Sequence, residues 1–127
     1  MSEKTIADKM YLKTAKSLAI FNGGVHPTIV AQLPQELIDA AGAESGPADA
    51  VLLFALNQNE LARHLPDALQ RLGDKGSLWI AYLKQSAPKA TDLTRESIDA
   101  YAKQFGVSTV AMISMDADWS ALRLKRL

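Results

Sequence analysis

Residues 112–126 read Met112-Ile-Ser-Met-Asp-Ala-Asp-Trp-Ser-Ala-Leu-Arg-Leu-Lys-Arg126, and this stretch decides the fold. Apolar and polar residues alternate on both sides of an Asp-Ala-Asp turn, which is the pattern of two antiparallel strands joined by a tight connection. We therefore predict a β-hairpin with strands over 107–115 and 119–126. A hairpin at this position closes one side of a sheet, so it gives the architecture rather than the chemistry.

Two continuously apolar runs upstream predict the centre of that sheet. They are Asp49–Leu56 (Asp-Ala-Val-Leu-Leu-Phe-Ala-Leu) and Gly76–Leu83 (Gly-Ser-Leu-Trp-Ile-Ala-Tyr-Leu). Strands that are apolar on both faces are typical of a parallel sheet covered by helices on each side. A shorter run, Ser17–Phe21, predicts a further strand that ends in a turn at Asn22-Gly23-Gly24, where glycine tolerates a positive φ.

Helical patterns separate these strands. A short helix is expected to begin at Pro27. A second helix follows Asn57, which resembles the first residue of a capping box, and Pro66 should kink or divide it. A third helix follows Thr94. The pattern over residues 34–47 leaves open whether a short strand or a longer helix precedes the loop there.

The order of these elements predicts an α/β fold: a Rossmann-like three-layer sandwich whose mainly parallel sheet ends in an antiparallel C-terminal hairpin. With 127 residues, 48% of them hydrophobic, we expect a single domain over 1–127, in which residues 1–15 form a polar lead-in. Such a sheet is similar to the C-terminal half of the Rossmann-like methyltransferase fold. A likeness of fold alone carries no function.

Four stretches of the sequence resemble a known family. They are Asp49–Phe54, Gly76–Lys84, Thr91–Thr94 and Asp118–Arg123, in this order and spacing. Together they resemble a family of small bacterial proteins described only as a domain of unknown function, over about the last two-thirds of the chain. The sharpest elements are the strand that holds tryptophan and lysine and the final Trp-Ser-x-Leu-Arg. The resemblance implies the fold and no established activity, so it transfers no catalytic residue.

Several kinds of chemistry are excluded by residues that are missing. The sequence has no cysteine, which excludes disulfides, thiolate nucleophiles and sulfur-ligated metals. The two histidines, His26 and His64, have no metal-binding spacing, and no serine lies in a G-x-S-x-G motif. We predict no metal, no cofactor and no catalytic residue. Charged residues near the start of the sequence interrupt any apolar signal segment, and no apolar run is long enough to span a membrane. We therefore expect a cytoplasmic protein.

The charge pattern argues against a nucleic-acid partner. Fourteen basic residues balance fourteen acidic ones, whereas binding to a phosphate backbone needs a net basic face. Both ends of the chain nevertheless lean basic. If the ends meet in space they form a modest basic edge, although ordinary solvated charge is the favoured explanation. The residues concerned are Lys4, Lys9, Lys13, Lys16, Arg123, Lys125 and Arg126.

A candidate ligand site lies where the strands of an open α/β sheet end. Asn22, Gly23 and Gly24 follow the first strand, in the place of a cofactor-binding glycine loop, although the G-x-G-x-x-G pattern is absent. Lys84 ends a central strand, and Asp92 follows in the next loop. An ammonium group and a glycine backbone could together hold a phosphate or carboxylate. The structural alternative, which we favour, is a plain turn at the glycines and an ion pair between Lys84 and Asp92.

The sequence therefore favours a non-catalytic cytoplasmic domain that binds a partner protein, or a small ligand, at the carboxyl edge of the sheet. The alternative is a degenerate S-adenosylmethionine-dependent methyltransferase-like enzyme, which is disfavoured because the chain is short for that fold and lacks the glycine signature. A nucleic-acid accessory protein that uses the basic ends is a third, weaker hypothesis. A homodimer is expected, because an antiparallel edge strand offers a surface for pairing.

Overall fold

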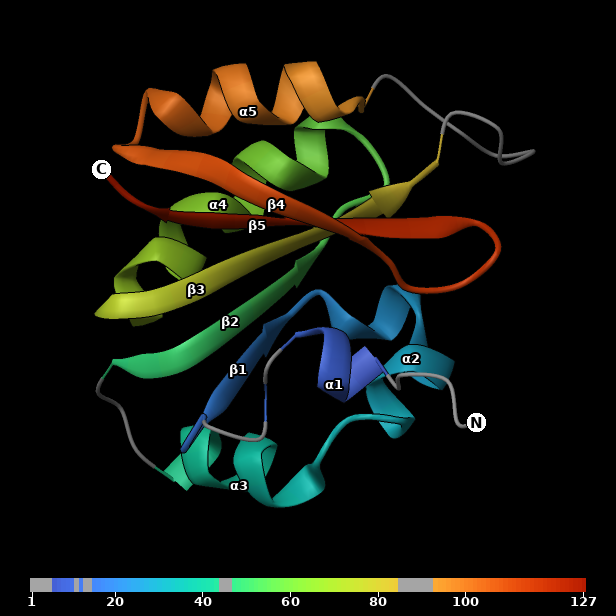
Figure 1. Cartoon of the computed structure of the whole chain (residues 1–127), viewed down its shortest axis with the longest axis vertical. Coiled ribbons are helices and arrows are strands. Elements are labelled where there is room, and N and C mark those ends of the chain that lie inside the picture. The colour runs from blue at the N-terminus through green and yellow to red at the C-terminus, as the bar shows by residue number, and fades with distance from the viewer. Residues whose placement is uncertain (1–5, 11, 13–14, 44–46, 85–92) are drawn as a thin grey trace.

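The structure, a computed structural model, describes residues 6–10, 12, 15–43, 47–84 and 93–127. In these parts of the chain five strands form one sheet in the order β1-β2-β3-β5-β4 (Figure 1). β1, β2 and β3 run parallel, whereas β5 is antiparallel to both β3 and β4. The predicted sheet with its C-terminal hairpin is confirmed. The strands are β1 (Leu18–Phe21), β2 (Ala48–Phe54), β3 (Leu72–Leu83), β4 (Val107–Ser114) and β5 (Trp119–Arg126).

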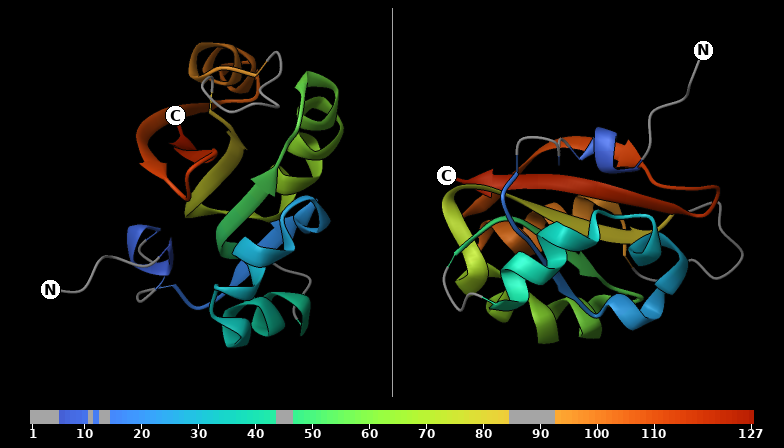
Figure 2. Two further views of the ribbon diagram at one scale, coloured as in Figure 1. Left: turned by 90° about the vertical axis from the view of Figure 1, so that its right-hand side faces the viewer. Right: turned by 90° about the horizontal axis from the view of Figure 1, so that it is seen from below.

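Helices pack on both faces of the sheet and make the expected three layers. One face is covered by α4 and α5, and the opposite face by α1, α2 and α3. Figure 2 shows the sheet from its edge, with α1 and α4 on opposite sides. The helices are α1 (Ile6–Lys9), α2 (Pro27–Ala31), α3 (Gln35–Ala43), α4 (Gln58–Arg71) and α5 (Arg95–Lys103), with a short 3-10 helix, η1 (Gly23–Val25).

The central strand β2 explains why its sequence is apolar without alternation. Val51 and Leu53 pack toward α4, whereas Leu52 and Phe54 pack toward α2 on the opposite face. All four side chains are fully buried. Burying a side chain of this size stabilises the fold by about 1.5–3 kcal/mol, so a strand covered on both sides gains about twice as much as a half-exposed one.

The structure decides the state of residues 34–47 and the continuity of the helix around Pro66. The open stretch 34–47 contains α3, and residues 44–46 of the expected loop lie outside the described residues. Helix α4 continues through Pro66 without being divided. Proline removes the amide that would bond to the carbonyl of Ala62. Ala62 is exposed, so water can hydrate that carbonyl and the helix can continue.

Strand β3 begins at Leu72, earlier than the predicted start at Gly76. The additional residues pair with the start of β2, where the register shifts between Ala48 and Ala50. A Cβ atom on Gly76 would lie 2.9 Å from the carbonyl oxygen of Asp49. Glycine at this position therefore allows the two backbones to approach closely.

The N-terminal segment also contributes to the core. In the stretch that was predicted to be a polar lead-in, Ile6, Met10 and Leu12 are buried.

The start of α5 agrees with the sequence pattern. Thr94 caps α5 in a capping box with Ser97, as expected from its position. No helix in the described parts of the chain is both long and apolar enough to cross a membrane.

Candidate functional site

The carboxyl ends of four strands lie at one edge of the sheet. β1, β2 and β3 are parallel, and β4 runs in the same direction as β3 because both are antiparallel to β5. Open α/β sheets bind ligands at this edge. Five polar residues gather there, and we call them the carboxyl-edge cluster: Asn22, His26, Glu60, Lys84 and Asp116.

Asn22 closes the corner between β1 and β2. Its side-chain Nδ2 donates hydrogen bonds to the carbonyl oxygen of Phe54 and to Oε1 of Glu60, each at 2.9 Å. The same Oε1 accepts from the amide of Leu56 at 2.9 Å. These bonds tie the end of β1 to the start of α4. The Asn22 amide thereby occupies the corner that a cofactor approaches in a dinucleotide-binding fold.

The glycines after Asn22 have a different role from the one expected. Positive φ was predicted at glycine, and this is wrong: Asn22 itself adopts φ 60, a conformation that asparagine tolerates better than most residues. A Cβ atom on Gly23 would lie 2.9 Å from Cγ2 of Ile20 and 3.3 Å from Cγ2 of Val30. Gly23 therefore lets η1 pack closely on β1. At Gly24, by contrast, an added Cβ would meet nothing within 4 Å.

His26 and Asp116 connect the start of α2 to the turn of the C-terminal hairpin. Nε2 of His26 lies 2.9 Å from Oδ2 of Asp116, and the amide of Ile29 donates a longer bond of 3.4 Å to Nδ1 of His26. An imidazole that accepts at Nδ1 donates from Nε2, so in this arrangement His26 donates to Asp116. Both ring nitrogens are engaged by the protein itself, which leaves this histidine poorly placed to act as a general base.

Asp116 organises the hairpin turn through its second carboxylate oxygen. Oδ1 accepts from the amides of Asp118 at 2.9 Å and Trp119 at 2.8 Å, which is an Asx turn. Burial acts to raise the pKa of Asp116, but the hydrogen bond from His26 and the two amide bonds outweigh burial. The pKa of this carboxyl is therefore lowered from its ordinary value.

Aromatic rings pack behind the histidine. The His26 ring lies 5.5 Å from the Trp119 ring at an interplanar angle of 64°, and Phe54 lies 5.8 Å from Trp119 at 69°. Edge-to-face contacts of this kind are favourable. Phe54 is fully buried and Trp119 is 7% exposed. Trp119 is thus part of the core, and the rings fill the space behind the cluster.

Lys84 holds the hairpin to the end of β3. Its Nζ donates to Oγ of Ser114 at 2.8 Å and to the carbonyl oxygen of Asp116 at 2.9 Å. Its own amide donates to the carbonyl of Asp118 at 2.7 Å. Asp92, which was expected to share a crevice or an ion pair with Lys84, lies outside the described residues.

The structure brings Lys84 and the glycines to the same edge, through a chain of contacts. Lys84 bonds to Asp116, Asp116 bonds to His26, and the amide of His26 donates to the carbonyl of Gly23 at 3.1 Å. The sequence identified Lys84 and Gly23, at the two ends of this series of contacts, but not the contact between Asp116 and His26 that joins them. The Asp-Ala-Asp turn was read as a hairpin signal, and His26 as a lone structural histidine, because nothing in a linear pattern shows that the two meet.

The cluster does not provide metal ligands. Among the described residues, no group of three or more histidine, aspartate or glutamate side chains could hold a metal ion. The chemistry available at this edge is therefore hydrogen bonding and charge. Most of it is already used within the protein.

Comparison with known protein families gives a match that covers most of the chain. The model of a family described as "Protein of unknown function (DUF3052)" matches residues 22–127. The chain belongs to this family. The DUF3052 match begins at Asn22 and thus includes the whole carboxyl-edge cluster, further toward the N-terminus than the resemblance seen in the sequence. Among curated proteins, the comparison gives no match.

Solved structures that resemble this DUF3052 protein include S-adenosylmethionine-dependent methyltransferases. Magnesium protoporphyrin IX methyltransferase from Synechocystis PCC 6803 gives a TM-score of 0.62 at 7% identity, over 96% of this chain and 80% of that one. A TehB-like methyltransferase from Corynebacterium glutamicum gives 0.57 at 10%, over 99% and 90%. An O-methyltransferase family protein from Burkholderia thailandensis gives 0.58 at 15%, over 90% and 52%, so the chain spans about half of that protein.

These likenesses establish the Rossmann-like fold, as the sequence predicted. At such low identity they establish the fold alone.

Proposed function

We propose that this DUF3052 protein is a non-catalytic cytoplasmic domain that binds a partner protein through the carboxyl edge of its sheet. The observation that carries the proposal is the position of Asn22. Its amide is bonded to Phe54 and Glu60 in the corner where a nucleotide-type cofactor would otherwise approach the main chain. His26 supports the same conclusion, since both of its ring nitrogens have partners within the protein.

The shape of this edge favours a protein partner over a small ligand. Small-molecule sites are concave. Two hollows formed by the described residues lie elsewhere: one at the opposite edge, beside Ser77, and one between α5 and β4, beside Asp99. At the carboxyl edge, by contrast, the hairpin tip at Ala117 and the turn at Gly24 are exposed. Exposed turns held on a rigid scaffold are common contact surfaces between proteins.

Site-specific photo-cross-linking in the cells that naturally produce the protein tests this proposal. A photoreactive amino acid replaces Ala117 at the hairpin tip in one strain and Ala62 on α4 in a matched control strain. Both alanines are exposed and neither is buried in the core. We expect a discrete cross-linked species of defined mass from position 117 that position 62 does not give.

Identical patterns from the two positions, or no species from position 117, would contradict the proposal. Mass spectrometry of the cross-linked band then identifies the partner. The residue of the partner that carries the cross-link shows whether the contact is specific.

A second candidate function is an S-adenosylmethionine-dependent enzyme. The observation that favours it is the likeness of the fold to methyltransferases, together with Gly23 and Gly24 at the end of β1. Cofactor binding separates the two candidates, because an enzyme of this class must bind S-adenosylmethionine, whereas the first candidate does not.

A further inference from the structure

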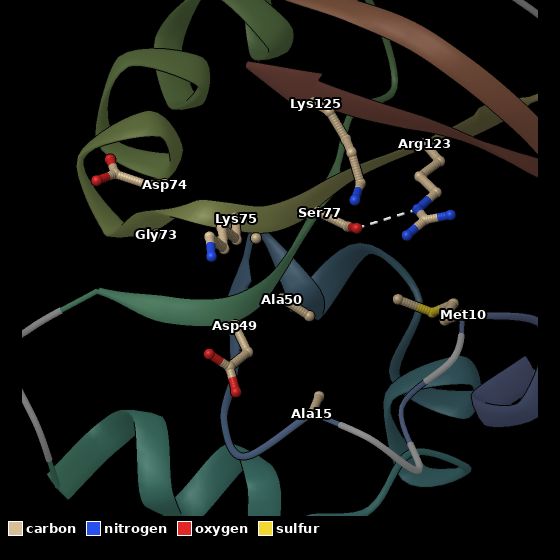
Figure 3. Close-up of a pocket in the computed structure, with 11 residues that line it drawn as sticks. Met10, Ala15, Asp49, Ala50, Gly73, Asp74, Lys75, Ser77, Arg123 and Lys125 are labelled. Carbon is tan, nitrogen blue, oxygen red and sulfur yellow. Dashed lines mark hydrogen bonds between the residues drawn. The ribbon is translucent and has the colours of Figure 1, made fainter.

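A hollow of about 320 Å³ lies at the amino edge of the sheet, opposite the carboxyl-edge cluster (Figure 3). Its walls come from the starts of β2 and β3, the end of β5, and the segment around Met10 and Ala15. A volume of about 300 Å³ is at the lower end of the range for sites that bind small molecules. Segments near both ends of the chain therefore meet here, although neither Lys9 nor Lys16 lines the hollow.

Three cationic side chains line this hollow: Lys75 on β3, and Arg123 and Lys125 on β5. Residues two apart on a strand point to the same face, so Arg123 and Lys125 extend together. Figure 3 shows both of them reaching from β5 toward Ser77 on the neighbouring strand. Lys75 lines the same hollow from the start of the neighbouring strand β3, and Figure 3 draws its amine away from those of Arg123 and Lys125.

Arg123 is held in place before any ligand binds. Its Nε donates to Oγ of Ser77 at 3.0 Å, and its Cζ lies 5.8 Å from the ring centroid of Trp79, which is fully buried. A guanidinium that rests on an aromatic ring and is bonded to a hydroxyl loses little conformational freedom when an anion binds. This is the difference between a prepared anion site and a freely moving surface charge.

The lining holds two carboxylates, Asp49 and Asp74, against the three cationic side chains. Oδ2 of Asp49 accepts from the amide of Lys16 at 2.8 Å, which anchors this carboxylate on the opposite wall. Asp74 points away from Lys125 and Arg123 in Figure 3. Within the described parts of the chain, the side chains of Lys75 and Lys125 make no hydrogen bond or ion pair. A protein with a net charge of zero therefore has a local positive excess here.

We propose that this hollow binds a small ligand that carries a phosphate group. A guanidinium binds phosphate through paired N–H donors, and lysines add point charges around it. The small size of the hollow favours a small phosphate ester over a nucleic acid, which would need a longer basic stripe to neutralise successive phosphates. This site is independent of the carboxyl edge, so the two proposals stand or fall separately.

Titration of the isotope-labelled protein with inorganic pyrophosphate, followed by NMR, tests the proposal. We expect saturable shifts of the amide signals of residues 75–77 and 123–125. The double variant Lys75→Gln/Lys125→Gln should bind about tenfold more weakly or worse, since it loses two charged contacts. The control Arg63→Gln/Lys103→Gln removes the same charge from α4 and α5, on the other face, and should keep the wild-type affinity.

The spectra of both variants also report whether each one is folded, so a loss of binding can be separated from a loss of structure. Three results would overturn the proposal: shifts that never saturate, an equal loss of affinity in the control variant, or shifts concentrated at the carboxyl edge. A single-stranded oligonucleotide that binds at the hollow far more tightly than pyrophosphate would replace the small ligand with a nucleic acid.

Discussion

Oδ2 of Asp116 lies 2.9 Å from Nε2 of His26, although 90 residues separate the two in the sequence. This contact joins the turn of the C-terminal hairpin to the turn that follows the first strand. The segment after β1 and the turn between β4 and β5 are therefore in direct contact at the carboxyl edge. The hairpin that decides the fold is thus also what closes the candidate site.

Replacing Asp116 with alanine should destabilise the protein by about 1–2 kcal/mol, because the bonds to His26 and to two amides of the Asx turn are lost. The loss of stability is modest because water competes for a carboxylate whose side chain is 37% exposed. Asp118→Ala is the matched control, since its backbone rather than its carboxylate makes the contact to Lys84. Urea denaturation measures both, and equal midpoints for the two variants would refute the assigned role.

The pKa of Asp116 predicts how stability depends on pH. Because folding lowers this pKa from that of an unfolded aspartate, about 3.9, the carboxylate adds stability that is fully present above that value. The contribution is lost as the pH falls through the lower pKa of the folded state. As the pH falls below about 4, the wild-type protein should therefore lose stability more steeply than Asp116→Asn. Denaturation midpoints measured across this range with parallel slopes would contradict the expectation.

The sheet could be predicted from the sequence because its signals are local. The apolar runs at Asp49–Leu56 and Gly76–Leu83 indicate burial on both faces, and alternation on each side of the Asp-Ala-Asp turn indicates a hairpin. Each strand reports its own environment through its own pattern. The hairpin predicts that β4 and β5 are neighbours, and the structure shows that β5 is the inner strand of the two, paired with β3.

The candidate site could be predicted only in part, because its contacts join distant segments. Strand ends indicated Asn22 and Lys84, but no local pattern connects His26 to Asp116 or Glu60 to Asn22. Asn57 caps α4 as expected, since its Oδ1 accepts from the amide of Glu60 at 2.9 Å. The Glu60 carboxylate accepts from the amide of Leu56 and, in a contact that no local pattern shows, from Asn22.

The amino-edge hollow was partly foreseen through the basic character of the two ends. Lys4 and Lys13 lie outside the described residues, so their contribution is not part of the structure. Arg123 and Lys125 line the hollow as a basic edge would require, and Lys75 joins them from β3. No local pattern points to Lys75, because only the fold brings the start of β3 beside the end of β5.

Gly23 and Gly24 offer a paired test of the packing at the end of β1. Gly23→Ala should destabilise the protein by about 1–3 kcal/mol, because the new methyl group would lie 2.9 Å from Cγ2 of Ile20. Gly24→Ala has open space around it and should be neutral or stabilise slightly, by up to about 1 kcal/mol. Thermal denaturation of the two variants measures the difference. If Gly24→Ala proved the more damaging of the two, the assigned packing role of Gly23 would be wrong.

Self-association stays a prediction, and the structure suggests where to test it. β4 forms one edge of the sheet and exposes Val110 and Met112 on its surface. A second copy could pair along this strand with two-fold symmetry. Light scattering at micromolar concentration should then give twice the monomer mass of 13.8 kDa, and Val110→Lys/Met112→Lys should give the monomer. A monomeric wild-type protein would end the idea.

The central claim is that the protein's own side chains close the carboxyl edge, so that no cofactor enters there. Isothermal titration of S-adenosylmethionine into the purified wild-type protein tests it most directly. We expect no saturable heat up to about 1 mM, a concentration at which even a weak site of about −4 kcal/mol is half filled. Saturable one-to-one binding with a micromolar dissociation constant, abolished by a bulky substitution at Gly24, would contradict the claim and identify the protein as a cofactor-binding enzyme of the methyltransferase type.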